Sequence, residues 1–140
     1  MPPAARPLAR SQTMSSDQTQ RRLRRRDAQR MFDELAADYL DLPDVSRAVM
    51  FGSDGLRVNA KFFAFVGGEG ELIVKLPAAQ CSALVAAGQA EPVRAGRSPM
   101  REWIGVPDVA DRADGAEWRE LMADAHRYVA SLTASSTTQP

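Results

Sequence analysis

The feature that most constrains the fold is a run of short segments rich in strand-forming residues between Val45 and Leu76. Four segments have the composition or the alternation of β-strands: residues 45–51, 56–58, 61–66 and 71–76. Residues 59–60 have the length of a hairpin turn, and the glycine-rich residues 67–70 are a strong turn signal. Four consecutive strands with tight links predict an antiparallel meander.

A helix is predicted before this run. Ser15 and Gln18 have the spacing of a capping box, and Pro43 ends the helix after Leu42. The apolar residues recur at the spacing of one buried helix face, at Ala28, Met31, Phe32, Leu35 and Tyr39. Arginines occupy this face ahead of Ala28, so we expect the first part of the helix to project beyond the folded body.

After the meander, Pro77 begins a short helix that Gly88 ends, and a loop over residues 92–99 leads to a fifth strand at residues 100–106. A last helix is expected from Asp114, with an apolar stripe from Trp118 to Leu132. The predicted order is α-β-β-β-β-α-β-α. This is an α+β domain with an antiparallel sheet of about five strands and flanking helices.

The length of 140 residues allows one domain with flexible ends. We expect residues 1–16 to be disordered, residues 17–133 to form the domain and residues 134–140 to be a polar tail. Met14 is a candidate start codon, by its position alone. No run approaches the ~20 apolar residues of a membrane helix, and no secretory signal is present. With a single cysteine, these observations predict a cytoplasmic protein with no membrane partner.

Positive and negative charges cancel over the whole chain but separate along it. Residues 1–30 hold eight arginines and two aspartates, a net charge of +6, so the other 110 residues carry −6. A cluster within this segment comprises Arg21, Arg22, Arg24, Arg25 and Arg26. It could be a solvated arm, bind an acidic protein surface such as a second copy of the chain, or contact nucleic acid through phosphates.

The chain offers few groups for catalysis. The single histidine, His126, falls at the edge of an apolar helix stripe and the single cysteine, Cys81, on a buried helix face. Packing is the simpler explanation for both, although their mutual approach stays open. Neither glycine-rich segment, 52–55 or 67–70, leads from a strand into a helix as a phosphate-binding loop does. We therefore expect no catalytic residue, no cofactor and no metal site.

Residues 49–66, with the sequence Val-Met-Phe-Gly-Ser-Asp-Gly-Leu-Arg-Val-Asn-Ala-Lys-Phe-Phe-Ala-Phe-Val, resemble the N-terminal domain of the TfoX/Sxy family. The similarity continues at intervals to about residue 130. The residues that carry it are Met50, Phe51, Gly52, Gly55, Lys61, Phe63, Lys75, Gly88, Pro99, Met100, Trp103 and Pro107. Asn59-Ala60 stands where relatives often have Asp-Gly, and Trp103 where many have Tyr.

This resemblance implies a small α+β domain, similar to the TfoX N-terminal and YjbR-like folds, without a known catalytic centre. Family members with an added C-terminal domain regulate natural competence; the chain ends soon after Leu132, so we do not carry that role over. The motif residues are expected to be structural. The predicted function is a non-enzymatic interaction or regulatory domain that contacts another protein or a second copy of itself. The alternatives are a nucleic-acid-associated protein that uses the arginine cluster and, less favoured, an enzyme acting on a small molecule.

Overall fold

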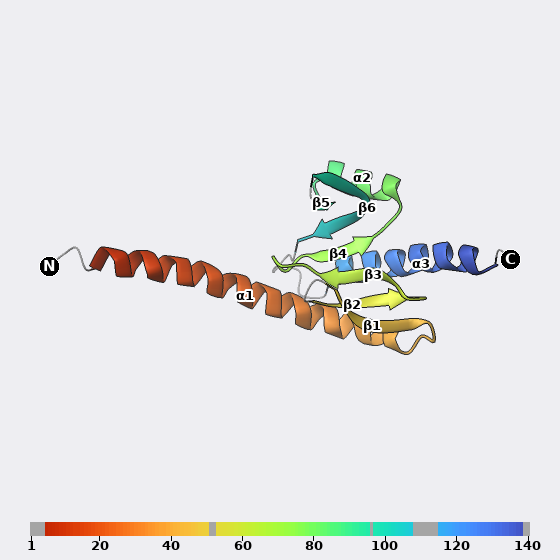
Figure 1. Ribbon diagram of the computed structural model, residues 1–140, viewed down its shortest axis with the longest axis horizontal. Coiled ribbons are helices and arrows are strands. Elements are labelled where there is room, and N and C mark those ends of the chain that lie inside the picture. The colour runs from red at the N-terminus through yellow and green to blue at the C-terminus, as the bar shows by residue number, and fades with distance from the viewer. Residues whose placement is uncertain (1–4, 51–52, 96, 108–114, 139–140) are drawn as a thin grey trace.

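A computed structural model describes residues 5–50, 53–95, 97–107 and 115–138 of the chain (Figure 1). Within these ranges the chain forms three helices and six strands. In chain order they are α1 (Ala5–Leu40), β1 (Val45–Met50), β2 (Ser53–Val58), β3 (Lys61–Val66), β4 (Leu72–Lys75), α2 (Ala78–Ala86), β5 (Glu91–Ala95), β6 (Ser98–Val106) and α3 (Ala116–Thr138). The α+β class is confirmed.

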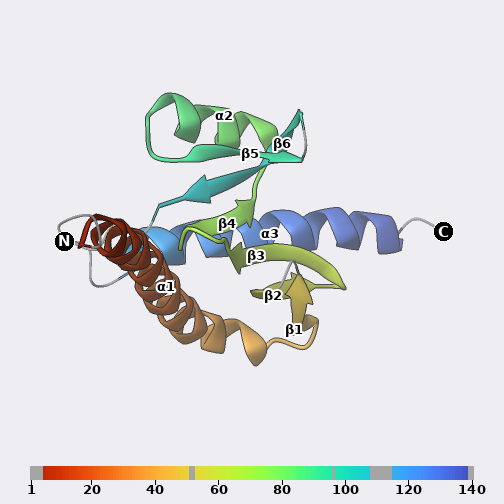
Figure 2. The ribbon, with the colours of Figure 1, turned by 60° about the vertical axis from the view of Figure 1, so that its left-hand side comes forward.

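The strands form one antiparallel sheet in the spatial order β1-β2-β3-β4-β6-β5. The first four strands are the predicted meander. Helix α2 then carries the chain to the far edge, where β5 lies, and β6 returns between β4 and β5. Figure 2 shows α1 and β1 at one end of the sheet and α2 with β5 and β6 at the other.

The sheet has one strand more than predicted, because β5 lies in the segment expected to be a loop. Pro92 has no backbone N–H to donate, which argues against a strand in the middle of a sheet. The strand is nevertheless possible because β5 is at the edge and pairs only with β6. The pairing is also irregular, with a register shift between Pro92 and Val93.

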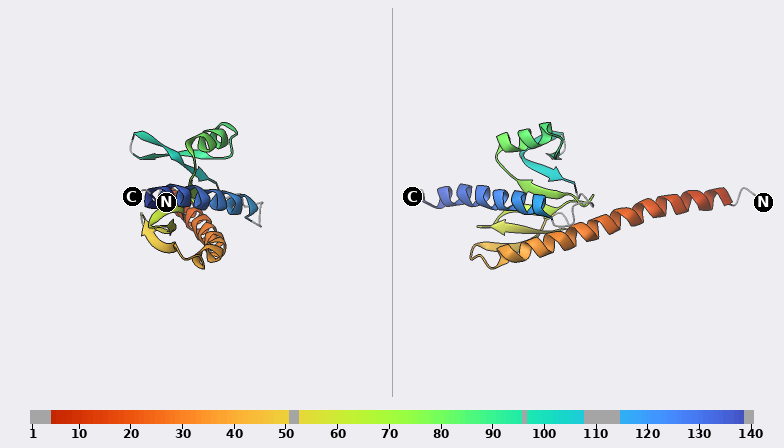
Figure 3. Two further views of the ribbon diagram at one scale, coloured as in Figure 1. Left: turned by 90° about the vertical axis from the view of Figure 1, so that its right-hand side faces the viewer. Right: turned by 180° about the vertical axis from the view of Figure 1, so that it is seen from behind.

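All three helices lie on the same face of the sheet, as Figure 1 and the reverse view in Figure 3 show. Helix α3 packs on β2, β3 and β4, α1 on β1 and β3, and α2 on β5 and β6. Between helices and sheet lies the core. Its largest fully buried side chains are Phe32, Phe63, Leu56, Leu72, Leu76, Ile104, Met122, Val66, Val74 and Val106. Among the described residues, no helix covers the opposite face, here called the open face.

A bulge in β3 changes which phenylalanines enter the core. Leu56 pairs with Ala64 and Arg57 with Phe62, so Phe63 has no partner on β2. Strict alternation would place Phe63 with Phe65; instead Phe63 shares the helix-covered face with Ala64 and is fully buried. Phe62 and Phe65 face the other way, onto the open face.

Two of the helices are longer than expected. Helix α1 begins at Ala5, so residues 5–16, for which we expected no regular structure, are helical, and it ends at Leu40. Extending an existing helix avoids the cost of nucleation, and Pro7 is acceptable in a first turn. Helix α3 likewise continues through the expected tail to Thr138. Asp114, the expected start of α3, lies outside the described residues.

Candidate functional site

The arginine cluster lies where α1 leaves the folded body. The part of α1 that follows it is anchored in the core by Ala28, Phe32, Leu35 and Ala36, which are at most 5% exposed. By contrast, every side chain from residue 18 to residue 27 is exposed. Figure 1 shows the helix running on past the sheet as an arm. The chain therefore presents its arginines on a helix whose direction the core sets.

Within the described part of the chain, the β3–β4 turn lies close to this stretch. The β3–β4 turn brings Glu69 to within 4.0 Å of the Arg21 guanidinium, but both side chains are more than 60% exposed, so the pair contributes little to stability. A Cβ on Gly70 would lie 3.1 Å from the Arg24 carbonyl oxygen, so this turn approaches the helix backbone closely. The cluster is thus held beside the body without being buried by it.

Two of the motif residues in the meander, Gly55 and Phe63, are tightly packed. A Cβ on Gly55 would lie 3.0 Å from Phe62 Cδ1, 3.0 Å from Phe65 Cβ and 3.1 Å from the Ala64 carbonyl oxygen, so any larger residue requires these neighbours to shift by a few tenths of an ångström. Phe63 fills the core, and Lys61 is exposed at the start of β3. Met50 lies in β1, with a side chain that is not described, and Phe51 and Gly52 lie outside the described residues.

The remaining motif residues lie in or beside α2 and β6. Gly88, with φ of 75°, ends α2 in a Schellman motif, in which the Gln89 and Gly88 N–H groups donate to the Leu84 and Val85 carbonyls. Pro99 and Met100 belong to β6, which ends before the exposed Pro107.

Aromatic rings on the open face lie beside cations. The Trp103 ring packs 5.8 Å from the Phe65 ring, and the Lys75 ammonium lies 6.0 Å from the Trp103 centroid. At the other end of the face, the Arg57 guanidinium lies 5.9 Å from the Phe62 centroid. Each pair is within the range of a cation–π contact. The sequence analysis did not predict that Trp103 would lie beside Lys75, or Phe62 beside Arg57.

Beside Lys75, a polar contact joins β6 to α3. The Tyr128 hydroxyl donates a hydrogen bond to Glu102, whose other carboxylate oxygen lies 3.7 Å from the Lys75 ammonium. The hydrogen bond to Glu102, followed by burial and by the charge of Glu102, raises the pKa of Tyr128 to about 12. Tyr128 therefore stays protonated at neutral pH and acts as a donor.

Cys81 and His126 have different contacts. The Cys81 thiol donates to the Leu76 carbonyl at 3.5 Å, and burial raises its pKa, which disfavours the nucleophilic thiolate. The His126 ring packs against Tyr39 and Phe63, with ring centroids 5.5 and 5.4 Å apart. Burial lowers the pKa of His126 and keeps it neutral. Both residues serve packing, as their apolar helix faces predict.

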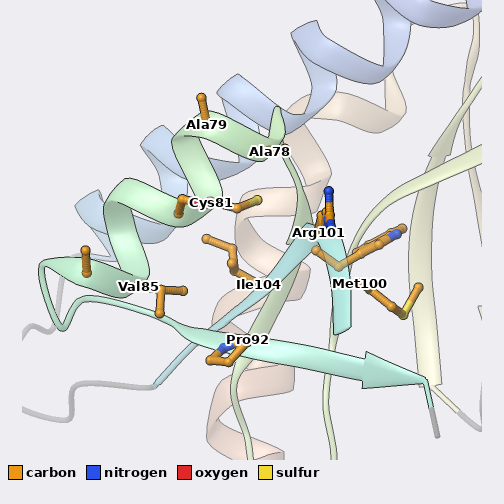
Figure 4. A pocket seen from close by; sticks show the side chains of 11 residues that line it. Ala78, Ala79, Cys81, Val85, Pro92, Met100, Arg101 and Ile104 are labelled. Carbon is orange, nitrogen blue, oxygen red and sulfur yellow. The ribbon is translucent and has the colours of Figure 1, made fainter. Parts of the chain in front are cut away.

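A cleft of about 550 Å³ lies between α2 and the β5–β6 hairpin (Figure 4). Its lining is mostly apolar and comes from Ala78, Ala79, Cys81, Ser82, Val85, Ala86, Pro92, Met100, Arg101, Trp103 and Ile104. The sequence analysis missed this cleft, because it depends on how β6 bends beneath α2. The one sequence signal that could have indicated the cleft was the series of small residues along α2.

Within the described ranges, no group of three or more His, Cys, Asp or Glu side chains is placed to hold a metal ion. Over those same ranges, no helix is both long enough and apolar enough to cross a membrane.

The sequence profile of the YjbR family matches residues 40–128. The chain belongs to the YjbR family. No similar protein was found among curated proteins. The YjbR match covers the whole sheet, α2 and α3 as far as Tyr128, and it begins at the last residue of α1. The cleft therefore lies inside the matched YjbR region, whereas the arginine cluster precedes it.

Proposed function

We propose that this YjbR-family chain is a non-enzymatic interaction domain that binds an acidic protein surface, in the first instance a second copy of itself, through the arginine cluster of α1. A regulatory role like that of the TfoX N-terminal domain, which the motif in residues 49–66 resembles, belongs to the same proposal. The observation that carries it is the exposure of five arginines on a helix anchored by Phe32 and its neighbours.

Two physical properties of the arm support binding. A helix whose direction is set by the core loses less conformational freedom on binding than a flexible tail. More of the free energy of its contacts therefore contributes to affinity. Arginine side chains also match carboxylates with paired hydrogen bonds. The net charge of −6 on residues 31–140 provides such carboxylates on a second copy.

The chemistry of Cys81 and His126 supports a non-enzymatic role over the less favoured alternative of an enzyme. That alternative needs one of these groups to be activated in a polar cleft. Cys81 borders a mostly apolar cleft as a protonated thiol, and His126 lies among aromatic rings.

The test is self-association of the full chain by analytical ultracentrifugation at low and high salt. We expect dimers at low salt that dissociate when all five arginines of the cluster are changed to Gln. The matched control changes five exposed arginines outside α1 to Gln, namely Arg94, Arg97, Arg101, Arg119 and Arg127, and keeps the dimer. A monomer under all conditions, together with no protein captured from a lysate in a cluster-dependent way, contradicts the proposal.

Nucleic acid is the second candidate partner, because the same exposed arginines can contact phosphates. Five contacts predict that a fourfold rise in salt weakens binding about 500-fold. Fluorescence anisotropy with labelled mixed-sequence DNA and RNA measures this for the full chain, the cluster variant and a chain lacking residues 1–26. No binding at low salt, or binding unchanged by the truncation, excludes this partner.

A further inference from the structure

The cleft beside α2 exists because its two walls cannot close on each other. On one wall, α2 presents small side chains, Ala78, Ala79, Ser82 and Ala86. On the other wall, β6 departs from β5: Pro92 pairs with Ile104 and Val93 with Met100, so residues 101–103 have no partner on β5. The bend in β6 and the short side chains of α2 together leave a volume of about 550 Å³, within the usual range of small-molecule clefts.

The two ends of the cleft differ in chemistry. Figure 4 shows Val85, Pro92 and Ile104 together at one end, where the walls are apolar. Arg101 lies at the other end, near the first turn of α2. Among the described residues that line the cleft, Arg101 carries the only charge, and the structure gives it no ion pair with any of the described carboxylates.

The geometry points to a binding site for a small amphiphilic carboxylic acid, with its apolar chain between Val85, Pro92 and Ile104 and its carboxylate on the Arg101 guanidinium. The guanidinium matches a carboxylate through two parallel hydrogen bonds. The first turn of α2 has no side-chain cap, so its free N–H groups add to the positive potential at this end. The size of the cleft fits a small molecule rather than a protein surface.

Trp103 makes the site measurable. It borders the cleft, whereas the other tryptophan, Trp118, is 4% exposed in the core. A ligand in the cleft is expected to change the fluorescence of Trp103, and the change disappears in Trp103→Phe. Titration calorimetry on the same samples gives the affinity without depending on either ring.

The experiment compares decanoate with decanol, below their aggregation concentrations, on the full chain. We expect decanoate to bind at one saturable site, with affinity rising about tenfold for every two methylene groups from hexanoate to decanoate. Arg101→Gln is expected to weaken the binding of decanoate at least tenfold and to leave the binding of decanol unchanged. No saturable binding of decanoate overturns the proposal, and equal effects of Arg101→Gln on acid and alcohol overturn the role of Arg101.

A matched pair of α2 variants tests the location. Ser82→Phe places a ring in the cleft and is expected to abolish binding, whereas Ala83→Phe changes an exposed residue outside the lining and keeps it. Circular dichroism checks that both variants fold. Binding that survives Ser82→Phe overturns the site. The variant that lacks the five arginines of α1 should bind decanoate normally, so this proposal and the proposed function fail separately.

Discussion

Asn59 and Ala60 form the turn between β2 and β3 with φ angles of 52° and 68°. Both angles are positive, as in the type I′ turns that join right-twisted strands, and Asn tolerates this region while Ala does not. Asn59 also donates a hydrogen bond to the Thr133 hydroxyl of α3, at 2.7 Å. The conformation at Ala60 is therefore imposed by the hairpin.

Ala60→Gly is expected to stabilise the protein by about 0.5–1 kcal/mol, because glycine adopts a positive φ without steric cost. Urea unfolding followed by circular dichroism measures the change. As a control, Ala83→Gly on the exposed face of α2 should destabilise by about 1 kcal/mol. Loss of stability in Ala60→Gly would contradict the assignment of strain to this position.

Gly55→Ala is expected to destabilise the fold by about 1–3 kcal/mol, because the new methyl group forces Phe62, Phe65 and the Ala64 carbonyl to move apart. Gly68→Ala is the matched control, since nothing lies within 4 Å of the Cβ it would add. Unfolding free energies of the two variants measure the difference. Equal stability would show that the open face rearranges freely around Gly55.

At the scale of elements, α1 is one helix with two environments. Its last third is packed on the sheet, whereas residues 18–27 are exposed. A helix with polar residues on all sides gains little from burial, so the arm depends on continuity with the anchored turns. Packing on the sheet at one end thus sets the direction of the exposed arginines at the other.

Phe32→Ala is expected to cost about 3–5 kcal/mol, because Phe32 is fully buried. Leu23→Ala changes a side chain that is 49% exposed and should stay within about 0.5 kcal/mol of the parent. Thermal and urea unfolding of both variants provide the comparison. A large loss of stability in Leu23→Ala would mean that the arm packs on the body.

At the scale of the whole molecule, three elements meet at His126. Tyr39 comes from α1, Phe63 from the bulge in β3 and His126 from α3. Their rings contact one another pairwise, so this cluster joins both large helices to the sheet. The imidazole is neutral there because burial lowers its pKa.

Stability should fall as the pH drops below about 6.5, the usual pKa of histidine in an unfolded chain. In that range the unfolded chain takes up a proton that folded His126 does not, so stability rises with pH until the unfolded form is also neutral. His126→Phe keeps a ring and should flatten this dependence between about pH 7.5 and 5.5. Unfolding free energies of the two proteins across that range measure the pH dependence. An unchanged slope of unfolding free energy against pH in the variant would contradict the role of His126.

The sequence by itself determined the meander, the ends of α2 and the class of the fold, because these depend on residues close in the chain. Hairpin turns at 59–60 and 67–70, the start at Pro77 and the stop at Gly88 are local signals, and all are confirmed. The arginine cluster was also visible, because it is a property of composition along one segment.

Only the tertiary structure decided the rest, because each remaining feature depends on partners that are distant in sequence. Pairing with β6 made β5 a strand despite Pro92, and the register between β2 and β3 placed Phe63 in the core. The cleft needed the bend in β6 to face the small residues of α2. Local preferences select elements, but which surfaces stay open is decided when the elements pack.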